Sequence, residues 1–335
     1  MITVCFYNNQ NELKIINNSQ TEFLDLKIEP HTWLYLSEPT EEEVSFVSKT
    51  TKVSEALIKA TLDSEESAHV DEEGPVTIVV IDTPIVRMES KYPEVEHYTT
   101  IPLAILLSDE YVITTCSKKD VVISNMMKNF KNLSPQKPIR LTIQILYKNA
   151  LTFVSMLKEV DKDSEFIQSK LQEALKNSDL FELMNLGKSL VYLSTALNSN
   201  QVVLDKLKNH PLFVQFPDGL ALIDDAIIEN RQAIEMCSIH RDILNGSMDT
   251  YASVISNNVN SIMKTLTILT IVLTIPMLVA SFFGMNFDLP FAANKGFWTA
   301  LIISLVLSIL FGYFLALYTS KLRYQSLNKK KKKQK

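Results

Sequence analysis

Small polar side chains and methionines recur at a regular spacing in the last third of the chain. Successive members are separated alternately by four and three residues: Ser281, Met277, Thr274, Thr270, Thr267, Met263, Asn260, Ser256, Ser253 and Asp249. A mean step of about 3.5 residues keeps side chains on one face of a helix in a bundle. Because hydroxyl, amide and carboxylate oxygens can pass a hydrated cation along such a face, the pattern predicts a polar path.

A simpler explanation covers part of this pattern. Threonines in a membrane helix often pack against another helix and donate a hydrogen bond to their own main chain. For Thr267, Thr270 and Thr274 alone, this explanation would be preferred. The unbroken extension to Asn260 and Asp249 favours a water-filled pore among several copies, with rings of threonine, constrictions of methionine and a ring of Asp249 at the inner mouth.

Two stretches without a charged residue predict two membrane spans. They run from Thr265 to Phe287 and from Gly296 to Ser320, 23 and 25 residues, and about 20 apolar residues suffice to cross a bilayer. The first span is placed at 265–283, the connecting loop at 284–295 and the second span at 296–320. The tail, 321–335, has eight bases and no acid, so the positive-inside rule predicts that both termini are cytoplasmic.

The region before the first span predicts a long helix. Between Pro217 and Pro276 there is no proline, and a helix from about Asp218 to Phe283 would rise roughly 100 Å. Residues 218–264 would form a stalk below the membrane, and Pro276 is expected to kink the span. So long a helix needs neighbours, which predicts self-association.

Residues 1–138 predict a mixed α/β domain, and residues 139–217 a helical part. Apolar runs predict strands at Ile2–Tyr7, Leu13–Ile16, Thr32–Leu36, Val76–Ile81, Ile101–Leu107 and Tyr111–Cys116. Helices are predicted at Thr40–Thr50, Val53–Leu62, Ile139–Lys176 and Leu180–Asn209. The order of the strands does not follow from the pattern.

Charge and motifs limit the classes of function. Residues 1–264 carry 24 Lys and Arg against 37 Asp and Glu, a net charge of −13, which disfavours nucleic acid and attracts cations. There is no phosphate-binding glycine loop, no HExxH and no CxxC. The sequence therefore predicts no enzyme and no organic cofactor.

The tripeptide Gly284-Met285-Asn286 stands at the outer end of the first span. In that position, behind a long soluble region and ahead of a short basic tail, it resembles the signature of the CorA family of divalent-cation transporters. The segments Arg241–Leu244, Met263-Lys264 and Leu266–Ile268 are similar to the stretch that joins stalk and pore in that family.

The resemblance implies an α+β cytoplasmic domain of αβα type, a long stalk helix and two C-terminal transmembrane helices, assembled as a funnel-shaped homopentamer in the cytoplasmic membrane. It implies Mg2+ uptake down the electrochemical gradient, with Gly284, Met285 and Asn286 at the external mouth. It also implies that five residues already on the polar face line the ion path: Asp249, Asn260, Met263, Thr270 and Thr274.

Three departures from the family pattern leave the preferred ion and the gate open. Phe283 stands where many members have tyrosine, and Asp288-Leu289-Pro290 replaces an acidic Met-Pro-Glu-Leu in the loop. Thr274 stands where many relatives have a bulky methionine gate. A zinc, cobalt or nickel transporter of the same family is therefore an alternative, and a membrane-anchored scaffold protein is an alternative from another class.

A conducting pore of this kind needs uncharged ligands at its external mouth and a means of closing. Mg2+ gives up its water reluctantly, so the Asn286 amide suits the hydrated ion, whereas a carboxylate would release it slowly. Two charges crossing about 100 mV gain roughly 4.6 kcal/mol. We expect intracellular Mg2+ to close the pore by bridging carboxylates of adjacent subunits.

Asp225 is the first candidate for that bridge, because it falls where the stalk helix of the family carries an acid between subunits. Asp63, Glu65 and Glu66, together with the run Asp71–Glu73, are candidate partners. The alternative for both acidic clusters is a solvated loop.

Overall fold

The computed structural model describes residues 1–7, 13–17, 28–87, 92, 95–128, 133–174, 176–283, 298, 301–315 and 317. The chain divides into two units, Met1–Met248 and Asp249–Lys335. Each unit is described by itself.

A seven-stranded sheet forms the centre of the first unit, in the order β2-β1-β3-β7-β6-β5-β4. The strands are β1 (Ile2–Tyr7), β2 (Leu13–Asn17), β3 (Thr32–Ser37), β4 (His69–Glu73), β5 (Val76–Arg87), β6 (His97–Leu107) and β7 (Tyr111–Cys116). Only the pair β3 and β7 is parallel among these described strands. The six predicted strands are confirmed, with β5 and β6 longer than expected.

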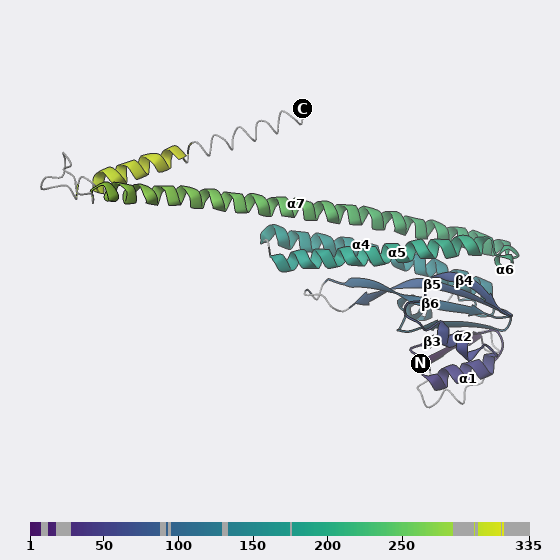
Figure 1. Cartoon of the computed structure of the whole chain (residues 1–335). Coiled ribbons are helices and arrows are strands. Elements are labelled where there is room, and N and C mark those ends of the chain that lie inside the picture. Colours follow the sequence, from purple (N-terminus) through teal and green to yellow (C-terminus); the bar gives the residue numbers. More distant parts are fainter. Residues whose placement is uncertain are drawn as a thin grey trace. The chain divides into compact units, whose positions relative to one another are not determined.

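Both faces of the sheet are apolar, so both must be covered. Side chains alternate between the faces along each strand. Leu34 and Val80 belong to a core shared with α1 (Glu41–Thr51) and α2 (Glu55–Ala60). Trp33 and Val79 belong to the opposite core, which is completed by α3 (Val121–Lys128), α4 (Pro138–Glu173), α5 (Asn177–Lys208), α6 (Pro211–Val214) and the start of α7 (Pro217–Phe283). Figure 1 shows α4 and α5 on the side of the sheet opposite to α1 and α2. This arrangement confirms the predicted αβα architecture.

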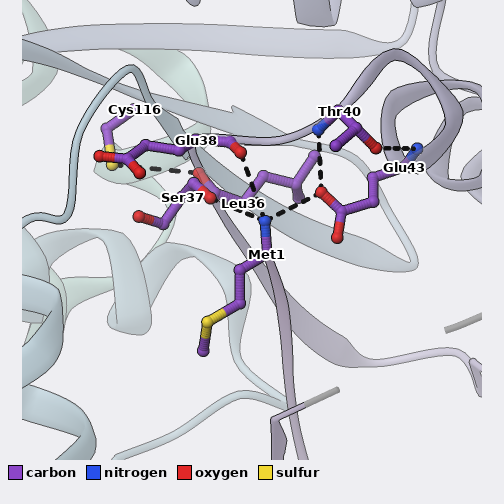
Figure 2. A network of polar contacts seen from close by, with 7 residues as sticks. All are labelled: Met1, Leu36, Ser37, Glu38, Thr40, Glu43 and Cys116. Atoms are coloured by element: carbon purple, nitrogen blue, oxygen red, sulfur yellow. Dashed lines mark hydrogen bonds and ion pairs between the residues drawn. The ribbon is translucent and has the colours of Figure 1, made fainter. Parts of the chain in front are cut away.

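Polar contacts hold the start of α1 against the end of β3. Thr40 and Glu43 form a capping box, in which the Glu43 amide donates to Thr40 Oγ1 at 3.3 Å and the Thr40 amide donates to Glu43 Oε2 at 2.9 Å. The Met1 main-chain nitrogen donates to the same Oε2 at 2.9 Å and to the Ser37 carbonyl at 2.8 Å (Figure 2). The buried Glu43 carboxylate thus ties Met1 to the start of α1, and Met1 in turn contacts the end of β3.

The structure corrects the sequence interpretation at three places. Asp71–Glu73 is not a loop, because these residues form β4 at the edge of the sheet. The helices α3 and α6 were not predicted. The first turn of α3 is held by buried Asp120, whose Oδ1 accepts from the Ile123 amide at 2.7 Å.

The helix α7 runs from Pro217 to Phe283, 67 residues, and continues through Gly246 and Pro276. This confirms the predicted long helix. A Cβ on Gly219 would lie 3.1 Å from Ile143 Cδ1, so glycine permits the first turn of α7 to approach α4. Further along α7, Ala226, Ala233 and Cys237 are fully buried.

Candidate functional site

The ten residues of the predicted polar path all lie on α7, in its second-unit part. Their side chains, from Asp249 to Ser281, are all exposed in the single chain, and Met277 reaches 71% exposure. Most of the helix is exposed here, so exposure alone does not identify a functional face. The packing of the opposite side shows which side of α7 is left free.

One side of α7 contacts a second apolar helix, Leu301–Leu315. Val272 and Pro276 line a groove together with Ser304, Ser308 and Gly312, and Ser308 is only 7% exposed. With about 100° of rotation per residue, Thr270, Thr274, Met277 and Ser281 project roughly opposite to Val272 and Pro276. The polar face therefore points away from the helix that packs against α7.

The threonine hydroxyls on this face donate to the main chain of α7 itself. Thr267 donates to the Met263 carbonyl at 2.8 Å, Thr270 to the Leu266 carbonyl at 2.9 Å, and Thr274 to the Thr270 carbonyl at 2.7 Å. The hydroxyl hydrogens are thus used as the simpler explanation from the sequence expects, in hydrogen bonds to the main chain of the same helix. This arrangement leaves the oxygen lone pairs as acceptors, and the water around a cation presents hydrogens as donors, so both interpretations are compatible.

The spacing of these exposed residues continues along α7 beyond the ten residues that the sequence interpretation identified. Below Asp249, the alternation of three and four residues continues without a break through Gly246, Asp242, Ile239, Glu235, Gln232, Ile228, Asp225 and Ala221. All eight residues are exposed, whereas Ala226, Asn230, Ala233 and Cys237 are buried on the other side. The spacing itself could have revealed this extension, but its members are partly apolar and lack a common chemistry.

We name this series of residues, from Ala221 to Ser281, the α7 face; because a 3.5-residue series drifts by about 20° per heptad on a straight α-helix, the name refers to the spacing and not to one side of the whole helix. The series carries four carboxylates, those of Asp225, Glu235, Asp242 and Asp249, and no base. Asp225, which the sequence interpretation treated separately as a regulatory residue, therefore belongs to the same spacing series as the predicted pore residues, in the first-unit part of α7. Each of these exposed carboxylates would attract a cation at its own position on the helix.

The candidate regulatory carboxylates do not form a complete metal site within one chain. The described residues contain no group of three or more His, Cys, Asp or Glu that could hold a metal ion. Asp63 accepts from the Glu65 amide at 3.0 Å, and Glu66 lies 3.5 Å from His69. Asp225 is exposed, whereas its neighbour Asp224 pairs with Lys208 at 2.7 Å.

Two predicted features lie outside the described residues. Gly284, Met285 and Asn286 fall between the end of α7 and Trp298, and the basic tail follows Leu317. Among the described helices, α7 alone is long and apolar enough to cross a membrane, and Leu301–Leu315 is a shorter apolar helix.

Comparisons with known proteins agree with this architecture. The profile of the CorA family, described as CorA-like Mg2+ transporter protein, matches residues 29–321. The cobalt/magnesium transport protein CorA of Methanocaldococcus jannaschii is 26% identical over 288 residues, which cover 84% of this chain and 88% of that protein.

Two solved structures share the fold. The complete CorA magnesium transporter of Methanocaldococcus jannaschii has a TM-score of 0.78 at 24% identity and covers 94% of this chain and 96% of that one. The cytoplasmic domain of ZntB from Vibrio parahaemolyticus has a TM-score of 0.54 at 12% identity, over 77% of this chain and 98% of that domain. Because the family profile spans most of its length, the chain belongs to the CorA family.

Proposed function

We propose that this chain is a divalent-cation channel of the cytoplasmic membrane that admits Mg2+ down its electrochemical gradient. The observation that carries the proposal is the second-unit part of the α7 face, from Asp249 to Ser281, which is mostly polar and exposed and, beside Val272 and Pro276, turned away from the second apolar helix. An anchoring helix has no need of such a face. Asp249, Asn260, Met263, Thr267, Thr270, Thr274, Met277 and Ser281 would line the path.

The α7 face also supports assembly of identical copies. It exposes large apolar side chains, among them Ile228, Ile239 and Met263, whose contact with water is unfavourable. Its period of about 3.5 residues is that of helices which pack around a common axis. We propose a homopentamer, in which a ring of α7 helices shields these side chains and encloses water between the hydroxyl and carboxylate groups.

The topology we propose has two spans, formed by residues 265–283 and 296–320, with the loop 284–295 outside the cell. The basic tail and residues 1–264 would then lie in the cytoplasm. Asn286 would stand in a ring at the external mouth, where neutral amide oxygens hold the hydrated ion and let it leave. No catalytic role is proposed.

Closure would depend on intracellular Mg2+. Since a single chain offers no complete metal site among its described residues, a regulatory ion would join carboxylates of different copies, with Asp225 as the central ligand and Asp63, Glu65 and Glu66 as candidate partners. At low Mg2+ the repulsion between the acidic bodies would open the ring. Mg2+ is thus proposed as both the transported and the regulatory ion.

The test is ion uptake into proteoliposomes containing the full chain or Asn286→Ala. Mg2+, Co2+, Zn2+ and Ni2+ are each supplied outside, because the related Methanocaldococcus jannaschii protein is named a cobalt/magnesium transport protein. We expect Mg2+ uptake by the unchanged chain and a loss of about tenfold or more in the variant. A preference for Zn2+, Co2+ or Ni2+ would identify the alternative transporter, and no uptake of any ion would leave the membrane-anchored scaffold.

A further inference from the structure

A cavity of about 740 Å³ opens in the first unit, where α4, α6 and the start of α7 meet the turn that follows β6. This volume lies within the range of sites that bind small organic molecules, roughly 300–1,000 Å³. The cavity is remote in sequence from the predicted pore residues, and neither the ion path nor the regulatory carboxylates use it.

The wall formed by α6 and by the residues that connect it to α7 is apolar and partly uncovered. Phe213 is fully buried beneath it, but Phe216 is 52% exposed and Leu212 is 39% exposed. Leu222, from the second turn of α7, lines the same cavity. Aromatic and aliphatic side chains left exposed at a concave surface are typical of a site that an apolar group covers.

The wall that α4 contributes is basic. Lys137 and Arg140 line the cavity and are exposed, and neither forms an ion pair within the described part of the chain. The first turn of α4 also has no acidic residue, and no side chain caps it. The free guanidinium of Arg140 offers the planar pair of donors that suits a phosphate.

Polar groups complete the lining. Ser108, Asp109 and Gln136 stand at the cavity together with the apolar and basic walls. Asp109 would repel a bare anion but can accept hydrogen bonds from the hydroxyl or amino groups of a larger ligand. The cavity therefore presents three chemistries side by side: a surface for a flat apolar ring, two cations, and acceptors for neutral donors.

We propose that this cavity binds a nucleotide, with its base against Phe216, its phosphate on Lys137 and Arg140, and its sugar hydroxyls near Asp109. Base stacking on an aromatic side chain and charge-assisted bonds to phosphate would supply the affinity. Gly219 and Leu222 line the cavity within the first two turns of α7. The bound nucleotide would therefore contact the helix that carries the α7 face.

The test is calorimetric titration of the purified full chain with AMP, adenosine and inorganic phosphate, in the presence of a chelator that removes divalent cations. We expect AMP to bind at least tenfold more tightly than either adenosine or phosphate, because only AMP engages both walls. The double variant Lys137→Gln/Arg140→Gln and the variant Phe216→Ala should each weaken AMP binding about tenfold or more. Lys158→Gln, which neutralises an exposed lysine of α4 away from the cavity, should bind AMP as the unchanged chain does.

Each contrary result overturns the proposal. Absence of AMP binding removes the site. Equal binding of phosphate and AMP shows a simple anion patch, and equal binding in the double variant places the nucleotide elsewhere. All the substituted side chains are exposed, and thermal unfolding of each variant checks that it folds. Ion uptake is not the readout, so failure of this proposal is distinguishable from failure of the channel proposal.

Discussion

Gly312 lies directly against Val272, so that a Cβ added to the glycine would come within 3.1 Å of Val272 Cγ2. Ser304 and Ser308 precede Gly312 at intervals of four residues and line the same groove. Small residues at this spacing let two helices approach closely in a membrane. The contact decides which side of α7 is occupied, and it leaves the threonines on the free side.

Replacing Gly312 by leucine should force the two helices apart. Overpacking of a close contact costs about 1–3 kcal/mol, so we expect Gly312→Leu to lower the unfolding temperature of the full chain in detergent and to reduce Mg2+ uptake. The control is Gly187→Ala, because a Cβ at Gly187 would only reach ordinary contact with Leu244 Cδ2 at 3.4 Å, and alanine should be neutral or stabilise α5 by up to about 1 kcal/mol. Unchanged stability in Gly312→Leu would contradict this packing.

Removing a hydroxyl from the α7 face should impair conduction without harming the fold. Valine has nearly the shape of threonine but offers no oxygen, so Thr270→Val replaces one ring of acceptors by methyl groups in an assembled pore. We expect the rate of Mg2+ uptake into proteoliposomes to fall by about tenfold, with unchanged thermal stability. Thr274→Val should act in the same direction.

The matched control for these variants is Thr265→Val. Thr265 is exposed and donates to the Ser261 carbonyl at 3.0 Å, as the other threonines donate to their own turns, but it lies outside the alternating series of the α7 face. The Thr265→Val variant should therefore take up Mg2+ at the same rate as the unchanged chain. If Thr265→Val reduced uptake as strongly as Thr270→Val, the effect would belong to helix packing rather than to the ion path.

Local patterns in the sequence were sufficient for most elements of the fold. Six strands followed from apolar runs, and α7 followed from the long interval without proline. The edge strand β4 was missed because its side chains are mostly charged and little buried. It therefore lacks the run of apolar residues by which a strand is recognised in a sequence. The parallel pairing of β3 with β7 joins segments about 80 residues apart, Leu34 with Ile113 for example, and no local pattern carries such information.

The site was predicted in part for a related reason. The polar members of the α7 face were recognisable by residue type, whereas Ile228, Ile239 and Gly246 continue it by spacing alone. The packing side of α7 could not be chosen from the sequence, since Val272 and Pro276 look like ordinary apolar residues of a span. The cavity beside α6 depends on the junction of three helices and a turn, which only the folded structure brings together.

Asp82 should make the first unit less stable as the pH rises. Burial raises the pKa of its carboxyl to about 6, above the usual value near 3.9 in an unfolded chain. The folded state therefore binds the Asp82 proton more tightly than the unfolded chain does. The contribution of Asp82 to stability is present in full below about pH 4 and is lost as the pH rises through about 6.

Asp82→Asn removes this dependence. The main chain at residue 82 is held by Asn149 and Asn200, whose amides donate to its carbonyl at 2.9 and 2.8 Å, and asparagine can keep these bonds. At pH 8 we expect the variant to be more stable by about 1–3 kcal/mol, measured by denaturant unfolding. A variant that loses stability between pH 4 and 6 as steeply as the unchanged chain would contradict the assignment to Asp82.

Regulation by intracellular Mg2+ should depend on Asp225 and not on its neighbour. Limited proteolysis of the full chain is the measurement, because ions that bridge subunits close the assembly and protect it. Couplings of 1–3 kcal/mol correspond to about 5- to 150-fold, so we expect Mg2+ to slow cleavage of the unchanged chain about fivefold or more. Asp225→Ala should lose most of that protection.

Asp224→Ala is the matched control, since it removes the adjacent carboxylate of the same helix. Asp224 already pairs with a cation, Lys208 Nζ at 2.7 Å, which offsets the negative charge that a shared ion would need. Loss of this exposed ion pair should lower stability by about 1 kcal/mol at most. The Asp224→Ala variant should therefore keep the protection by Mg2+. Protection that persists in Asp225→Ala, or that both variants lose equally, would show that the bridging ion is held elsewhere or does not exist.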